Sequence, residues 1–119
     1  MKFENTGIEN VTADLERLED VMKTHGLIKA GQWDYERVTF DRKFIIKEGT
    51  FYLRIQGLAV EGDIGADHAS IKLMTPLLGK HYYPHGVEYG DGEHFPAHLV
   101  DTCEKIIKQV MEEVQHFAH

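Results

Sequence analysis

The chain has 119 residues, of which 42% are hydrophobic, and this length and composition are ordinary for one folded domain. We therefore expect residues 1–119 to form a single domain that buries about two-thirds of its unfolded surface. The formal net charge is −7 and no run of Lys or Arg occurs, which argues against binding to nucleic acid or to an anionic membrane. The one cysteine, Cys103, excludes an intrachain disulfide and a cysteine-rich metal site, and a free thiol favours a reducing compartment.

The first residues lack the apolar core and the cleavage site of a signal peptide. No stretch reaches the roughly 18 apolar residues that cross a bilayer. We therefore expect a cytoplasmic protein that has neither nucleic acid nor a membrane among its partners.

An amphipathic helix is predicted near the N-terminus. Apolar residues recur there every three or four positions over residues 8–22, and acidic residues occupy the other faces. Thr6 and Glu9 have the spacing of a capping box, with Asn10 and Thr12 as competing caps. Gly26 is predicted to end this helix, because glycine readily adopts the left-handed conformation at that position.

A second helix is predicted at the C-terminus, from Pro96 to about residue 116. Proline suits the first turn of a helix, and a broad apolar stripe follows it. Cys103 lies on this stripe, so we interpret it as a small buried side chain and not as a reactive thiolate.

Between the helices the apolar period changes to two, which predicts β-strands. A first strand covers residues 37–47, although Arg42 falls on its apolar face. Glu48 and Gly49 then have the composition of a hairpin turn, which leads into a second strand from Phe51. We therefore expect an antiparallel hairpin at the centre of the chain.

The second strand is interrupted at Gly57, after which the alternation shifts and indicates a bulge. A third strand is predicted over residues 69–74, and residues 27–35 form a candidate fourth strand. Because the helices stand before and after the strands, the sequence favours an α+β fold with an antiparallel sheet of three to four strands, flanked by an N-terminal and a C-terminal helix. The helices would cover one face of the sheet. The other face would carry Trp33, Tyr35, Arg37, Tyr52 and Arg54.

The sequence has eight histidines, and two pairs of them are four residues apart. On a helix this spacing would let two imidazoles bind one divalent metal. However, Pro84 disfavours a helix across His81 and His85, while His94 and His98 straddle the start of the last helix. No nucleophile elbow and no phosphate loop occurs either. We therefore assign no metal-binding, catalytic or cofactor-binding residue and expect no cofactor.

Residues 79–94 are rich in glycine and aromatic residues and have no regular period, so they are predicted to form a long loop. Loops of this length are often functional, although the tyrosines could equally pack on the edge of the domain. Trp33 and Tyr35 have a similar ambiguity between a partner surface and cross-strand packing. The candidate ligand or partner surface is Trp33, Tyr35, Tyr52, Arg54, His81, Tyr83, His85 and Tyr89.

Several short segments, in this order, resemble the YugN-like family of small bacillar proteins. They are Gly31-Gln32-Trp33-Asp34-Tyr35, Phe40-Asp41, Tyr52-Leu53-Arg54-Ile55, Ala59-Val60-Glu61-Gly62 and Leu73-Met74-Thr75-Pro76-Leu77-Leu78, followed by Lys80-His81 and Gly86. The resemblance covers about residues 15–90, and Met74 departs from it where a small residue is expected. It implies a cytoplasmic bacterial α+β protein with an antiparallel sheet and carries over no activity, cofactor or catalytic residue.

The leading hypothesis is a non-catalytic binding or interaction domain that forms a homodimer, which would hide the open face of the sheet. The alternative is a small-molecule-binding protein or small enzyme with a site between the sheet and residues 79–94. In that case His81, His85 and Glu88 would be acid–base groups, or His94 and His98 metal ligands. A third option is a regulatory protein that docks on a basic partner through its negative charge.

Overall fold

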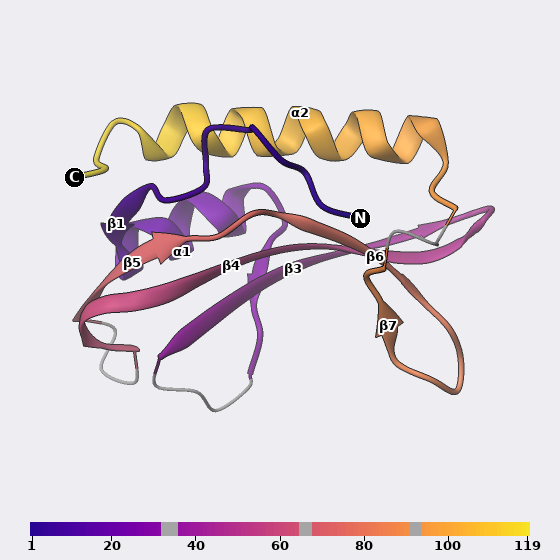
Figure 1. The fold of residues 1–119 in the computed structure, drawn as a ribbon, viewed down its shortest axis with the longest axis horizontal. Coiled ribbons are helices and arrows are strands. Elements are labelled where there is room, and N and C mark those ends of the chain that lie inside the picture. The colour runs from indigo at the N-terminus through magenta and orange to yellow at the C-terminus, as the bar shows by residue number, and fades with distance from the viewer. Residues whose placement is uncertain (32–35, 65–67, 91–93) are drawn as a thin grey trace.

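The computed structural model describes residues 1–31, 36–64, 68–90 and 94–119. Within these ranges the chain forms two helices and a seven-stranded antiparallel sheet, and both helices lie on one side of the sheet (Figure 1). The elements in chain order are β1 (Thr12–Asp14), α1 (Leu15–Thr24), β2 (Ile28–Lys29), β3 (Arg37–Ile46), β4 (Gly49–Asp63), β5 (His68–Leu73), β6 (Leu77–His81), β7 (Val87–Glu88) and α2 (Ala97–Val114).

The predicted α+β class is confirmed, but the prediction of three to four strands understates the sheet. The strands that the sequence pattern does not predict are short: β1, β6 and β7 have three, five and two residues, and the candidate strand over residues 27–35 contains β2, which has two. Such strands are too short to show an alternating pattern, so hydrogen bonding to a neighbour defines them. The predicted long loop over residues 79–94 is also wrong in part, because β6 and β7 form a hairpin there.

The long strand β4 organises the sheet. The strands follow the order β1-β5-β4-β3-β2, and β6 also pairs with β4. The second half of β4 pairs with β5 and its first half, from Phe51 to Arg54, pairs with β6. The β6–β7 hairpin therefore lies beside the start of β4, and it projects on the side away from the helices (Figure 1).

The central hairpin forms as predicted. β3 and β4 pair without a register shift from Arg37 opposite Leu58 to Ile46 opposite Gly49. The predicted bulge lies between Ala59 and Glu61, beyond Gly57. Gly57 instead leaves room for the side chain of Ile71 on β5, because a Cβ atom at residue 57 would lie only 2.3 Å from it.

Helix α1 begins at Leu15, later than the sequence pattern predicts. The side chain of Asp14 caps it by accepting a hydrogen bond from the amide of Arg17 (3.2 Å). Thr6 and Glu9 do bond to each other, since the Thr6 hydroxyl lies 3.1 Å from a Glu9 carboxylate oxygen. They close a turn and not a helix, because Asn10 has a φ of 72° and cannot continue one.

The ends of both helices are otherwise close to the prediction. Gly26 follows α1 with a φ of 75°, as expected for a residue that ends a helix. Helix α2 follows Pro96 and runs along α1, and His25 at the end of α1 contacts Glu113 of α2. None of the helices in the described part of the chain has the length and apolarity to cross a membrane.

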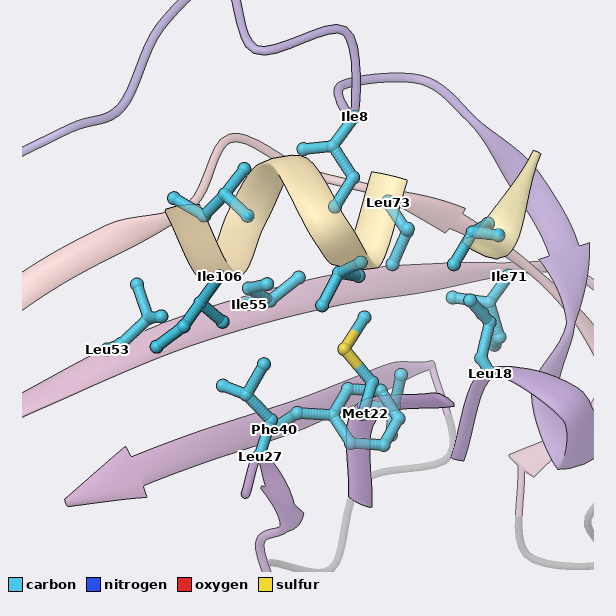
Figure 2. Packing of buried hydrophobic residues seen from close by; sticks show 14 of the residues in the cluster. Ile8, Leu18, Met22, Leu27, Phe40, Leu53, Ile55, Ile71, Leu73 and Ile106 are labelled. Atoms are coloured by element: carbon cyan, nitrogen blue, oxygen red, sulfur yellow. The ribbon is translucent and has the colours of Figure 1, made fainter. Parts of the chain in front are cut away.

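The core lies between the two helices and the sheet face beneath them. Figure 2 shows Phe40 of β3 and Ile55 of β4 on this face, with Met22 of α1 and Ile106 of α2 among the side chains around them. Phe40, Ile55 and Met22 are fully buried. At the rate of about 25 cal/mol per Å² of buried apolar surface, such a layer is the main source of stability.

Arg42 is the charged residue that falls on the apolar face of β3, as the sequence pattern indicates. Its guanidinium donates a hydrogen bond to the main-chain carbonyl of His25 (3.0 Å). The Cζ atom of Arg42 also lies 4.9 Å from the centre of the Phe44 ring. The side chain therefore runs over apolar surface and places its charge at the end of α1, where carbonyl groups favour a cation.

Candidate functional site

The face of the sheet that the helices do not cover carries a group of ordered polar and aromatic side chains. Along β4, Phe51, Leu53 and Ile55 are buried toward the helices, so Tyr52 and Arg54 point to the opposite face. This is the face that the sequence predicts for Tyr52 and Arg54. We call it the helix-free face.

Arg54 forms a two-pronged ion pair with Asp41, which lies directly opposite on β3. The Nε and Nη2 atoms of Arg54 donate to the two carboxylate oxygens at 2.9 and 3.0 Å. The side chains are only 27% and 21% exposed, and the hydrogen bonds to Asp41 raise the pKa of Arg54. The opposite charges of the two side chains therefore place little net charge on the surface.

Tyr89 follows β7 and packs across Gly79 of β6. A Cβ atom on Gly79 would lie 2.6 Å from the Tyr89 ring, so the absence of a side chain at residue 79 makes room for the ring. The Cζ atom of Arg54 lies 4.9 Å from the ring centre, in the range of a cation–π contact. The hydroxyl of Tyr89 is buried and has no hydrogen-bond partner in the described part of the chain.

Tyr52 completes the group with His81 from the end of β6. Their ring centres are 6.3 Å apart and the planes meet at 86°, an edge-to-face arrangement. We define the sheet-face cluster as Asp41, Tyr52, Arg54, His81 and Tyr89. Four of the eight side chains proposed from the sequence therefore come together, from strands that are far apart in the chain.

Two of the other four proposed residues lie apart from the sheet-face cluster, and the remaining two are not described. Tyr83 and His85 lie at the tip of the β6–β7 hairpin, where Tyr83 is 91% exposed. Trp33 and Tyr35 lie outside the described residues. The sequence analysis missed Asp41, although counting back from the predicted hairpin turn pairs it with Arg54.

Comparisons with known proteins agree with the resemblance seen in the sequence. The model of the YugN-like family matches residues 4–116. The chain belongs to the YugN-like family. The match extends the similarity beyond residues 15–90, so that it also includes all of helix α2.

YugN-like relatives are known from two bacilli. The chain is 59% identical over 110 residues to "Uncharacterized protein YlbA" of Bacillus subtilis, covering 92% of each chain. It is 32% identical over 84 residues to "Uncharacterized protein YugN" of the same organism, covering 70% of this chain and 63% of that protein. The crystal structure of uncharacterized conserved protein YugN from Geobacillus kaustophilus HTA426 matches with a TM-score of 0.86 and 56% identity, covering 98% of this chain and 96% of that one.

The acid–base and metal candidates of this YugN-like chain are spread over its surface. Glu88 pairs with Lys80, so its side chain lies on the face opposite to that of His81, and His85 is exposed. His98 contacts Glu48 at 3.0 Å, and this hydrogen bond lowers the pKa of Glu48. In the ranges that the structure describes, no three His, Cys, Asp or Glu side chains gather in a way that suits a metal ion.

Burial raises the pKa values of two acidic groups of this YugN-like chain, the Cys103 thiol and the Tyr89 hydroxyl, which makes both less reactive. It raises the pKa of the Cys103 thiol to about 12. It likewise raises the pKa of the Tyr89 hydroxyl to about 12, although the nearby Arg54 charge acts in the opposite direction. Both groups are therefore protonated at neutral pH, and neither is prepared to act as a nucleophile or a base.

The raised pKa of Tyr89 has a measurable consequence. In the unfolded chain a tyrosine loses its proton near pH 10.0, whereas Tyr89 in the folded protein keeps it until about pH 12. The folded protein therefore binds more protons across this window, and the free energy of unfolding should fall as the pH rises from 10 to 12. We expect Tyr89→Phe to lose less stability over the same window in denaturant titrations. A difference titration of the phenolate absorbance between the two proteins should have its midpoint near pH 12, and a midpoint at the ordinary tyrosine value would contradict the burial of this hydroxyl.

Proposed function

We propose that this YugN-like protein is a non-catalytic binding domain of the cytoplasm that works as a homodimer. The observation that carries the proposal is the apolar surface that remains on the helix-free face. Ile28, Ile45 and Leu58 are 54%, 76% and 38% exposed there, on β2, β3 and β4. These side chains lie at separate positions, and Ile45, the most exposed of the three, lies on an edge strand, so we expect protein to cover the surface around it.

The sheet-face cluster supports a binding role because its side chains are already held in place. Arg54 is fixed between Asp41 and the Tyr89 ring, and Tyr52 rests against His81. Fixed side chains lose little conformational freedom when a partner docks, and Tyr and Arg are frequent at the centres of protein interfaces.

The charge of the helix-free face supports the same role and suggests what it binds. Lys43 and Lys72 are exposed on this face together with the carboxylate of Glu61, while the charge of Asp41 is matched by Arg54. The chain as a whole has a net charge of −7, so this face differs in sign from most of the surface. We infer a partner surface with an apolar centre and acidic side chains around it.

Three observations support a non-catalytic role for the proposed binding domain. The thiol of Cys103 and the hydroxyl of Tyr89 have raised pKa values. The guanidinium of Arg54 is occupied by Asp41. Glu88 lies on the opposite face of the β6–β7 hairpin from His81, and His85 is exposed at its tip, so they do not form the acid–base group that the alternative hypothesis requires. The cytoplasmic setting rests on the lone free thiol, which suits a reducing compartment.

The substitution Ile45→Lys tests the homodimer. We expect wild-type protein to have twice the 13.7 kDa chain mass by light scattering, and the variant to dissociate at least about tenfold more readily, because a buried unpaired ammonium group costs more than about 1.4 kcal/mol. Gln109→Lys introduces the same charge on the exposed side of α2 and should leave the mass unchanged. Wild-type protein that stays monomeric up to about 1 mM would overturn the homodimer.

A further inference from the structure

The sheet has an open edge along β3. On its outer side β3 pairs with β2 only at Phe40 and Asp41, yet it continues to Ile46. In the described part of the chain, no segment pairs with the outer edge of residues 42–46. Such an edge is a ready template for another strand.

The main-chain groups at this edge point outward. The amide of Ala30 donates to the carbonyl of Thr39 (2.8 Å), so Thr39 directs its main-chain groups away from β4. The direction alternates along a strand, and therefore Lys43 and Ile45 direct theirs outward as well. Each of these residues offers one N–H and one C=O to a neighbouring strand.

The outer edges of β1 and β6 are partly covered by the ends of the chain. The carbonyl of Thr12 on β1 accepts a hydrogen bond from the amide of His119 (2.9 Å). The amide of Leu78 on β6 donates to the carbonyl of Met1 (2.8 Å), and Lys2 bridges to Leu77. The open edge of β3 contains no proline and no bulge, and its charged side chains, Arg42 and Lys43, limit the registers in which another strand can pair with it.

We propose that a second copy of this chain pairs with this edge in an antiparallel arrangement, about a two-fold axis at Phe44. Residues 42–46 of one copy would then face residues 46–42 of the other. A two-fold pairing of this kind uses the same edge in both copies and closes, so it leads to a dimer and not to a fibre.

The charges of the strand select this register. In an antiparallel pair, residues whose main-chain groups point outward must lie opposite one another. Within residues 42–46, the two-fold axis can therefore pass through Lys43, Phe44 or Ile45. Centring on Lys43 would set two copies of that lysine against each other, and centring on Ile45 would set Lys43 against Lys47. Centring on Phe44 sets Lys43 against Ile45 and Arg42 against Ile46, so no like charges meet.

The same register covers exposed apolar surface on both faces of the sheet. On the helix-free face the stem of Lys43 would lie over Ile45, which is 76% exposed in the single chain. On the helix side Phe44 would meet Phe44 of the other copy. The two sheets would run side by side, and the sheet-face cluster would stay open in both copies.

This inference rests on the proposed homodimer and names its interface, and disulfide trapping tests the interface separately. In the proposed register residue 43 of one copy faces residue 45 of the other at a Cα separation of about 5.5 Å, within the range of a disulfide. Lys43→Cys and Ile45→Cys are made as two single variants of the full chain, and the buried Cys103 stays in place. We expect covalent dimers to form under mild oxidation when the two variants are mixed, at least about tenfold faster than in either variant alone.

The outcomes separate the interface from the homodimer. A wild-type chain that is monomeric by light scattering would overturn both. A wild-type dimer whose mixed variants trap no faster than the single ones would overturn the β3 pairing and leave the homodimer in place. Leu58→Glu provides a second measurement, because Leu58 lies on the helix-free face but away from residues 42–46. It should leave the dimer intact, and a monomeric Leu58→Glu variant would indicate that the two sheets meet face to face.

Discussion

Replacing Phe40 with alanine should lower the free energy of unfolding by about 4 kcal/mol. The ring is fully buried on β3, opposite Ile55 of β4. Figure 2 places it beside Met22 of α1 and Leu27, so its neighbours belong to several separate segments. These segments cannot all move inward to fill the space, and the variant would therefore keep a cavity. Thermal unfolding should show a Tm lower by roughly 15 °C for a chain of this size.

Val60→Ala provides the control for the loss at Phe40. Val60 is 55% exposed at the irregular part of β4, so its truncation should change stability by less than about 0.5 kcal/mol. A loss at Phe40 of only about 1 kcal/mol would contradict its position at the centre of the core.

The elements that the sequence predicts well are those long enough to show a period. β3 and the first part of β4 alternate over many residues, and the turn between them has a recognisable composition. Together they fix the register of the central hairpin, and with it the pairing of Asp41 with Arg54. Helix α2 has an apolar stripe over 18 residues, which identifies it clearly.

The start of α1 shows where periodicity misleads. Ile8 and Leu15 are both fully buried and have the spacing of a helical stripe. Ile8, however, reaches the core from a turn, and the chain between them forms β1. The spacing of apolar residues indicates which residues are buried and not which element contains them. A buried residue in a turn can therefore match the spacing of a helical stripe.

The sheet-face cluster could be predicted only in part, for a related reason. Tyr52 and Arg54 belong to a long alternating strand, which assigns them to one face. His81 and Tyr89 reach that face through β6 and β7, whose pairing depends on contacts between distant segments. No local pattern in residues 79–94 marks Gly79 as the position over which an aromatic ring packs.

Gly79→Ala should lower the free energy of unfolding by about 2 kcal/mol and disrupt the sheet-face cluster. A Cβ atom at this buried position would lie 2.6 Å from both the Tyr89 ring and the side chain of Val87, so the ring must move. Alanine is otherwise favoured over glycine within a strand, and the direction of the effect therefore depends on this crowding alone. Once displaced, Tyr89 loses its contact with Arg54 and gains solvent. Its pKa should fall from about 12 toward the ordinary value of 10.0, which the phenolate absorbance measures.

Two further variants separate crowding from a general effect of removing glycine. Gly86→Ala changes the same hairpin at a position where a Cβ atom meets nothing within 4 Å, so it should be nearly neutral. In the background Tyr89→Ala, the substitution Gly79→Ala should cost less, because the ring is absent and only the side chain of Val87 remains within 2.6 Å of the added Cβ atom. If the cost of Gly79→Ala is the same with and without the ring, Tyr89 does not pack on Gly79. In that case, packing on Gly79 would not be what holds the Tyr89 ring against Arg54.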